Sequence, residues 1–245
     1  MANASQTERH ILPDPTAAAG AVAEWLLERA LAVEGRAALC LAGGNTPRMV
    51  YEMLADKPLR ERFPWDRVHW FFGDERVVPA TSPRSNYHMV RETLFDRVPI
   101  PPANIHAVPT DGGDAEKCAR AYETVLKQFY GSDRLAANRA LFAATLLGVG
   151  DNGHTASLFP GSPVLHERRR WAVGLSDPSV PEPRVTLTIP VLESSGEVAF
   201  LVTGAEKHAV VARLAHDDEL PAARIHPAGR LRWFLDRAAA NNGRR

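Results

Sequence analysis

The sequence predicts an α/β fold, in which a mainly parallel sheet is covered by helices on both faces. Short apolar runs typical of buried strands alternate along the chain with segments typical of helices. Several of these runs end in glycine followed by polar residues, which is typical of the edge where an open parallel sheet binds ligands. Because no linker, internal repeat or low-complexity tract interrupts the 245 residues, we expect one domain over 1–245.

The first half of the chain is expected to alternate between helices and buried strands. Asp14 and Asp114 can each cap the helix that follows, and Pro47 fits a first helical turn, where its missing N–H needs no partner. The strands are short, continuous apolar runs. In chain order these elements are a helix over 17–33, a strand over 37–42, a helix over 48–54, a strand over 67–72, a helix over 86–95, a proline-rich connector over 98–109 with room for a short strand at 105–108, and a helix over 115–129.

The second half is expected to contribute further strands and two helices. The run at 141–147 is closed by glycine, and the residues at 155–157 can open a helix after the turn. The run at 184–189 alternates β-branched residues, which favours a strand. The stretch at 229–240 is expected to be a helix that packs Trp233 and Phe234 inward. In chain order these elements are strands over 141–147, 171–175, 184–189 and 198–203, and helices over 208–214 and 229–240.

The composition is that of an ordinary globular protein. Its formal net charge is zero, which gives no indication of nucleic-acid or membrane-surface binding. No apolar stretch approaches the roughly 18 residues of a membrane span, and the N-terminus lacks the pattern of a signal peptide. Cys40 and Cys118 are expected to be free buried thiols in a reducing compartment. We therefore expect a soluble cytoplasmic protein.

Four of the expected strands are each followed immediately by a polar cluster. These clusters are GGNTP (43–47), GDER (73–76), GVGDNGH (148–154) and TGAEK (203–207). Because the carboxyl ends of parallel strands lie along one edge of a sheet, we expect the clusters to converge on one crevice. Ordinary loops would not all carry such residues on the same side, so this pattern is a stronger indication than any single motif.

His154 is the candidate general base. It follows a glycine-rich turn at the end of a buried strand, and an imidazole titrates near neutral pH. A histidine in such a turn can also cap a helix or hold a loop, and only the rest of the chain favours catalysis. No metal site is expected, because no two of the histidines have the close spacing of a zinc site. The Gly-x-Ser-x-Gly elbow of a serine nucleophile is absent as well.

The loop formed by Gly43, Gly44, Asn45 and Thr46 has the properties of a phosphate cradle. Its glycines expose backbone N–H groups, its threonine adds a hydroxyl, and the N-terminus of the next helix carries partial positive charge. A tight turn with a threonine cap is the alternative. Lys207 can balance a phosphate or can be an ordinary solvated lysine. The loop matches neither the dinucleotide fingerprint nor the Walker motif.

Asp74 and Arg76 lie two residues apart beyond a buried strand, so both can point into the same cleft if Glu75 turns away. Arg76 can donate to a developing oxyanion, and Asp74 can orient a hydroxyl or the arginine. A surface ion pair within a turn is the alternative.

Taken together, these motifs make the chain resemble the 6-phosphogluconolactonase family over nearly its whole length. The resemblance rests on GGNTP, GDER, SNYHM (85–89), GVGDNGHTASLFPGSP (148–163), RVTLT (184–188), TGAEK and WFLDRAAA (233–240). It implies a Rossmann-like sheet and a cytoplasmic enzyme that hydrolyses 6-phosphogluconolactone without metal, cofactor or covalent nucleophile. It also implies a monomer or small homo-oligomer whose partner is its small-molecule substrate.

The resemblance also implies roles for individual residues. His154 matches the general base, Arg76 the arginine at the carbonyl end of the substrate, and Asp74 its partner in the cleft. The substrate and its phosphate are expected to be held by the matching positions Gly43, Gly44, Asn45, Thr46, Gly153, Arg184 and Lys207.

Two positions depart from the expected pattern. The family usually has aspartate directly before Gly-His, where this chain has Asn152, with Asp151 one place earlier. An asparagine can form hydrogen bonds but cannot orient a proton electrostatically as a carboxylate does. Arg184 precedes its expected strand, so phosphate binding there requires that strand 185–189 runs antiparallel or that the site reaches around the sheet edge.

Two other functions are compatible with the same fold. A glucosamine-6-phosphate deaminase would carry carboxylates at the positions of Asn152 and Phe159, and both are missing here. A non-catalytic sugar-phosphate sensor usually carries a DNA-binding helix-turn-helix, and the residues before the first expected helix have no basic face.

Overall fold

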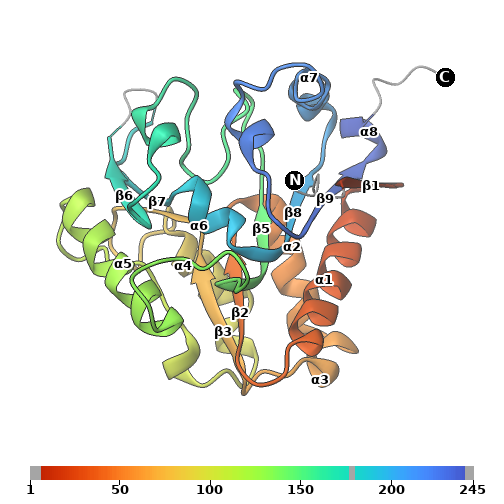
Figure 1. The fold of residues 1–245 in the computed structure, drawn as a ribbon. Coiled ribbons are helices and arrows are strands. Elements are labelled where there is room, and N and C mark those ends of the chain that lie inside the picture. The colour runs from red at the N-terminus through yellow and green to blue at the C-terminus, as the bar shows by residue number, and fades with distance from the viewer. Residues whose placement is uncertain (1–6, 177–179, 241–245) are drawn as a thin grey trace.

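The main sheet has six strands, all parallel, in the order β1-β9-β8-β5-β2-β3 (Figure 1). The computed structural model describes residues 7–176 and 180–240. The prediction of a mainly parallel sheet is confirmed. The strands are β1 (Thr7–Leu12), β2 (Ala37–Leu41), β3 (Val68–Phe72), β5 (Phe142–Leu147), β8 (Ser195–Val202) and β9 (Arg230–Asp236).

Helices cover both faces of this sheet (Figure 1). They are α1 (Pro15–Ala32), α2 (Asn45–Ala55), α3 (Leu59–Arg62), α4 (Asn86–Thr93), α5 (Ala115–Tyr130), α6 (Ile189–Glu193), α7 (His208–Arg213) and α8 (Arg237–Ala240). On one face α1, α2 and α3 contact one another, and Phe63, next to α3, stacks on Trp70 with 5.5 Å between ring centroids. Phe129 of α5 contacts Phe71 at 5.0 Å. Trp70 and Phe71 are neighbours in β3, and neighbouring residues of a strand point to opposite faces. These contacts therefore place α1, α2 and α3 on one side of the sheet and α5 on the other.

Asp14 and Asp114 cap α1 and α5, the helices that they were expected to cap. The side chain of Asp14 accepts a hydrogen bond from Ala17 N at 2.8 Å, and Asp114 accepts one from Lys117 N at 2.8 Å. Each carboxylate therefore pairs with an N–H group that the first helical turn leaves without a partner.

A second, antiparallel sheet of three strands lies beside the first, in the order β4-β7-β6. Its strands are β4 (Asp74–Arg76), β6 (Ala172–Leu175) and β7 (Arg184–Leu187). The runs at 171–175 and 184–189 are strands, as predicted, but they do not belong to the parallel sheet. β4 continues the chain of β3 through Gly73 and gives β7 an antiparallel partner. Because β7 runs antiparallel to β4, Arg184 at the start of β7 pairs with Arg76 at the end of β4. Arg184 therefore lies beside Arg76 although it comes before the rest of its strand.

The helix predicted over 229–240 is wrong for most of its length. Residues 230–236 form β9, an inner strand between β1 and β8, and only 237–240 are helical. The ring of Trp233 stacks on Phe200 of β8 at 4.2 Å, and Phe234 is buried, so both aromatic side chains pack inward from a strand. Pairing with two neighbours outweighs the local helical pattern.

Three smaller expectations also differ from the structure. Residues 7–12 form the edge strand β1, which was not predicted, because its side chains are all exposed or half-buried. No helix opens at 155–157; Thr155 and Leu158 instead bridge a tight turn. The short strand at 105–108 reduces to a single bridge between Ile105 and Trp70.

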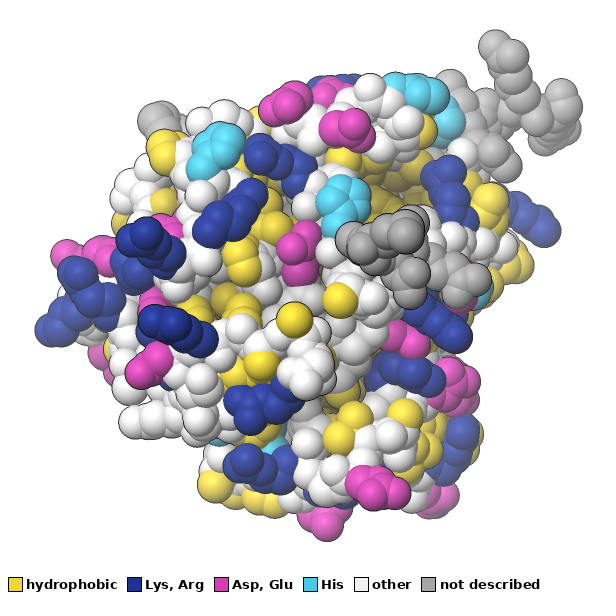
Figure 2. All heavy atoms as spheres, viewed as in Figure 1, with side chains coloured by type: hydrophobic (Ala, Val, Ile, Leu, Met, Phe, Trp, Pro, Cys, Tyr) yellow, Lys and Arg dark blue, Asp and Glu magenta, His cyan; other side chains and the backbone are white. Residues whose placement is uncertain are grey.

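Cys40 and Cys118 are buried and unpaired, as predicted. None of the helices in the described ranges is both long and apolar enough to cross a membrane. Acidic and basic side chains are interspersed over the face shown in Figure 2, in keeping with a net charge of zero. An anionic ligand must therefore be attracted by local groups rather than by the field of the whole protein.

Candidate active site

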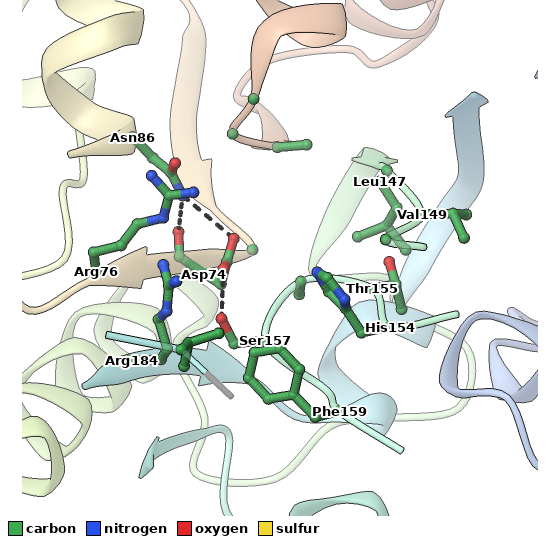
Figure 3. Close-up of a pocket in the computed structure, with 18 of the residues that line it drawn as sticks. Asp74, Arg76, Asn86, Leu147, Val149, His154, Thr155, Ser157, Phe159 and Arg184 are labelled. Atoms are coloured by element: carbon green, nitrogen blue, oxygen red, sulfur yellow. Dashed lines mark hydrogen bonds between the residues drawn. The ribbon is translucent and has the colours of Figure 1, made fainter. Parts of the chain in front are cut away.

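The carboxyl ends of the parallel strands border a cavity of about 410 Å³. Each of the four polar clusters contributes to its wall, as expected because the carboxyl ends of parallel strands share one edge. Seven of the ten predicted site residues line this cavity: Gly43, Gly44, Asp74, Arg76, His154, Arg184 and Lys207. In Figure 3 Asp74, Arg76 and Arg184 lie together on one side of the cavity, and His154 lies on the other side.

The other three predicted residues are not among those that line the cavity. Asn45 begins α2 and is exposed. The hydroxyl of Thr46 lies 3.2 Å from that of Thr203, so it links the first loop to the end of β8. Gly153 is buried in the histidine turn, with a positive φ of 83°, and donates its N–H to the Gly150 carbonyl at 2.9 Å. Gly153 thus shapes the turn from behind the cavity wall.

The imidazole of His154 lies directly against the backbone of its own turn. A Cβ atom at Gly150 would overlap the imidazole ring, so this position requires glycine. On its other side the ring contacts Phe159, with 5.0 Å between centroids. Because only glycine at position 150 leaves room for the ring, the glycine-rich turn determines where the imidazole lies.

Burial lowers the pKa of His154 below the ordinary value of about 6.5. The negative charge of Asp74 opposes this shift, whereas the positive charges of Lys207 and Arg184 reinforce it. The imidazole is therefore neutral at pH 7, which is the protonation state that a general base requires.

Asp74 is bound by neutral donors rather than by an arginine. Its Oδ2 accepts a hydrogen bond from the Ser157 hydroxyl at 2.6 Å, and its Oδ1 accepts one from Asn86 Nδ2 at 3.3 Å (Figure 3). Among the salt bridges of the described residues there is none between Asp74 and Arg76. The alternative of a surface ion pair within this turn is therefore wrong, and both side chains face the cavity.

Arg76 and Arg184 lie directly opposite each other on β4 and β7. Like charges in this arrangement repel, and burial, followed by the charge of Arg76, lowers the pKa of Arg184. Arg76 donates from one terminal nitrogen to the Arg84 carbonyl at 2.6 Å, while its buried Nε has no partner among the described residues. Arg184 lies 3.7 Å from Glu182, and its buried Nε likewise has no partner among the described residues. Each of the two guanidinium groups therefore keeps a donor for an oxygen that carries negative charge.

Lys207 is not a freely solvated lysine. Its side chain is only 23% exposed, and its Nζ lies 2.6 Å from Asp151 Oδ1. The side chain of Asp151 is 82% exposed, and the ammonium group lowers the pKa of this carboxyl. Exposed ion pairs contribute only about 0–1 kcal/mol, so an incoming phosphate can displace the carboxylate at little cost.

A family model described as glucosamine-6-phosphate isomerases/6-phosphogluconolactonase matches residues 13–233. The chain belongs to this family. It is 43% identical over 221 residues to 6-phosphogluconolactonase of Synechocystis, with 88% of each chain covered. It is 38% identical over 225 residues to the human 6-phosphogluconolactonase, with 85% of each covered. The crystal structure of 6-phosphogluconolactonase from Thermotoga maritima superposes with a TM-score of 0.80 at 33% identity, covering 95% of this chain and 100% of that one.

Asn152 stands where the resemblance noted from the sequence implies an aspartate. Its Oδ1 accepts a hydrogen bond from the backbone N–H of His154 at 3.1 Å and lies 2.6 Å from His154 Nδ1. Because a backbone N–H can only donate, the shared side-chain atom is the amide oxygen, and Nδ1 must therefore carry the proton. Nε2 is then the unprotonated nitrogen. An amide thus fixes the tautomer that a general base at Nε2 requires.

Phe159 separates the chain from the deaminase pattern within the same family. A carboxylate is expected here in a glucosamine-6-phosphate deaminase, whereas Phe159 is buried and packs its ring against His154. The site thus lacks the carboxylates of the deaminase pattern at both 152 and 159.

Two polar residues of the site were not predicted. Asn86 belongs to the SNYHM motif and Ser157 to the run after His154, but no periodicity or spacing in the sequence indicates that both bind Asp74. Ser157 and Asp74 lie 83 residues apart. Contacts of this kind become visible only when the two sheets are in place.

Proposed function

We propose that the protein hydrolyses 6-phospho-D-glucono-1,5-lactone to 6-phospho-D-gluconate, a reaction of the oxidative pentose phosphate pathway. The observation that carries this proposal is a single cavity in which the neutral imidazole of His154 shares the wall with Arg76, Arg184 and Lys207. Membership of the family and the two relatives named 6-phosphogluconolactonase support it.

The proposed mechanism begins with His154 Nε2 taking a proton from water while the water oxygen attacks the lactone carbonyl. Arg76 donates hydrogen bonds to the oxyanion that forms, and Asp74, held by Ser157, orients the hydroxyl groups of the sugar. When the intermediate collapses, the bond between the carbonyl carbon and the ring oxygen breaks. The imidazolium then returns its proton to the ring oxygen, which becomes a hydroxyl group.

The phosphate is proposed to lie against Arg184, Lys207 and the glycine loop of 43–46, with Gly153 supporting the turn on the base side. Binding the phosphate away from the bond that breaks would hold the carbonyl near the water, which lowers the entropic cost of reaction. We further propose that the protein works as a single cytoplasmic domain without a cofactor, as a monomer or small homo-oligomer; its two free thiols fit a reducing compartment.

A coupled assay tests the proposal. Glucose-6-phosphate dehydrogenase generates the lactone, and its disappearance is followed at slightly acid pH, where spontaneous hydrolysis is slow. We expect the purified protein to accelerate hydrolysis well above an enzyme-free control. A rate equal to that control at all protein concentrations would refute the proposal.

Replacing Lys207 with alanine is expected to raise KM for the phosphorylated lactone by roughly 10- to 100-fold, since charge-assisted hydrogen bonds contribute about 1.5–3 kcal/mol. At a pH above the range in which His154 titrates, kcat should change little, because the ammonium group is proposed to contact the phosphate and not the reacting atoms. Lys57→Ala is the matched control, as Lys57 forms an exposed ion pair of the same length, 2.6 Å, outside the cavity. Equal losses with phosphorylated and unphosphorylated lactone would contradict this role of Lys207.

The pH dependence of kcat should show an acid limb with a midpoint below about 6.5. Burial lowers the pKa of His154, so the imidazole remains an active base until the pH falls below its ordinary value. The second ionisation of a phosphate, near pH 6, falls in the same range, so the profile is also measured with unphosphorylated gluconolactone. A midpoint above 6.5 with both substrates would contradict a buried neutral base.

A further inference from the structure

Glu75 lies between the two site residues of β4 but points away from the cavity. It is 1% exposed, and its carboxylate accepts four hydrogen bonds. These come from the backbone N–H groups of Arg76 at 2.7 Å and Asn86 at 2.8 Å on Oε1, and from Tyr87 N at 2.8 Å and the Ser85 hydroxyl at 3.0 Å on Oε2. Among the described residues no lysine, arginine or histidine forms a salt bridge with it. This buried carboxylate is thus stabilised by neutral donors alone.

Three of these four donors belong to the start of α4. Ser85 is the N-cap, and Asn86 and Tyr87 are the first residues of the helix, whose N–H groups have no partner within the helix. A negative charge at this end is also favoured by the helix dipole. Burial raises the pKa of Glu75 above its ordinary value, and the three backbone N–H groups oppose this shift. Each carboxylate oxygen accepts two hydrogen bonds, so the four donors are matched to the form without a proton. The carboxylate therefore fastens α4 to β4.

Both of these elements carry residues of the cavity wall. Asn86 Nδ2 donates to the Asp74 carbonyl at 3.0 Å and approaches Asp74 Oδ1 at 3.3 Å. The same amide would overlap a Cβ atom at Gly43, so it also packs against the first glycine loop. The guanidinium of Arg76 is held by the carbonyl of Arg84, directly before α4. Figure 3 shows Asn86, Asp74 and Arg76 close together at this part of the wall. How α4 and β4 are joined therefore determines the positions of these side chains.

We propose that Glu75 is a positioning residue for the reaction, which acts by holding Arg76 and the start of α4 in fixed relation at the cavity wall. The inference rests on the proposed function, because it assigns Glu75 an effect on catalysis through Arg76. All four partners of the Glu75 side chain are donors, so this position requires a group whose two oxygens both accept hydrogen bonds. A glutamine would turn an N–H₂ group toward N–H or O–H donors and would lose about half of the four hydrogen bonds.

The first test compares Glu75→Gln with Glu197→Gln in the full-length protein. Glu197 is a matched control, since it is 5% exposed and is bound by Trp25, Arg29 and Arg232, but lies outside the catalytic cavity. At a temperature where circular dichroism shows both variants folded, we expect kcat to fall at least about tenfold for Glu75→Gln, as displaced donors commonly cost this much. Glu197→Gln should stay within about twofold of the wild type. Equal kcat values for the wild type and Glu75→Gln would overturn the proposal.

The second test is a double-mutant cycle with Arg76→Ala, which a general loss of stability would not reproduce. If Glu75 acts through Arg76, Glu75→Gln should lower kcat by less than about threefold when Arg76 is already alanine. The same fold-loss on both backgrounds would overturn the proposal. If Glu75→Gln does not fold, Ser85→Ala removes the hydroxyl that donates to Glu75 and that caps α4 by accepting from His88 N, and it should lower kcat several-fold. An unchanged kcat would overturn the inference. Absence of hydrolysis by the wild type would refute the proposed function itself, whereas an active wild type with an indifferent Glu75 refutes only this inference.

Discussion

Replacing His154 with alanine is expected to lower kcat by about 10²- to 10⁴-fold, the usual contribution of general acid–base catalysis. The imidazole is neutral because burial lowers its pKa, and its proton is held on Nδ1 by Asn152 at 2.6 Å. In the proposed mechanism Nε2 is therefore the nitrogen that takes a proton from water. An alanine leaves no base at this position, and only water itself remains to accept the proton.

The measurement is the initial rate of lactone disappearance with saturating substrate, corrected for spontaneous hydrolysis. His216→Ala is the control, since His216 is exposed and lies outside the cavity; it should retain activity within about twofold of the wild type. Wild-type turnover by the His154 variant would remove this residue from the mechanism.

Replacing Arg76 with alanine is expected to lower kcat by roughly 10²- to 10³-fold, as does the loss of an oxyanion donor in other hydrolytic enzymes. Its guanidinium is fixed by the Arg84 carbonyl, and its buried Nε has no partner among the described residues. Donors held in place before reaction stabilise the oxyanion without the cost of reorganisation. Lysine should not restore the rate, because it lacks the planar fork of donors.

Steady-state kinetics separates this role from phosphate binding. Loss of an oxyanion donor lowers kcat, whereas loss of a phosphate ligand raises KM. Arg91→Ala is the control, because Arg91 pairs with Asp96 at the surface and does not line the cavity. A rise in KM with an unchanged kcat would show that Arg76 binds the phosphate instead.

The parallel sheet and the convergence of its loops were predictable because buried parallel strands are continuous apolar runs. The strands β2, β3 and β5 each read this way and end in glycine and polar residues. Once the strands are taken as parallel, their carboxyl ends must share one edge. The placement of His154 and Arg76 in one cavity follows from that rule rather than from either residue alone.

The C-terminal strand could not be predicted because its polar residues are satisfied by distant partners. Arg232 of β9 binds Glu197 of β8 and Glu8 of β1, at 2.7 and 2.6 Å. Residues 230–236 read RLRWFLD, in which three apolar residues follow one another, and such a short apolar run does not distinguish a strand from a helix. The edge strand β1 was missed because its side chains are all exposed or half-buried, so that its pairing with β9 had no counterpart in the apolar pattern.

The side chains that support the site could not be predicted from the sequence for a related reason. Asn86, Ser157 and Glu75 act through hydrogen bonds to other parts of the chain, and such bonds leave no periodic pattern. Asn152 illustrates the opposite case. The departure at this position was visible, but only the geometry shows that an amide oxygen can orient the imidazole.

A crystal structure with bound 6-phospho-D-gluconate would show whether the imidazole and the guanidinium meet the same end of the substrate. We expect the carboxylate of the product to lie within hydrogen-bonding distance of His154 Nε2 and Arg76, with the phosphate against Gly44, Arg184 and Lys207. A product bound in the opposite direction, or bound with His154 Nε2 turned away from its carboxylate, would contradict it.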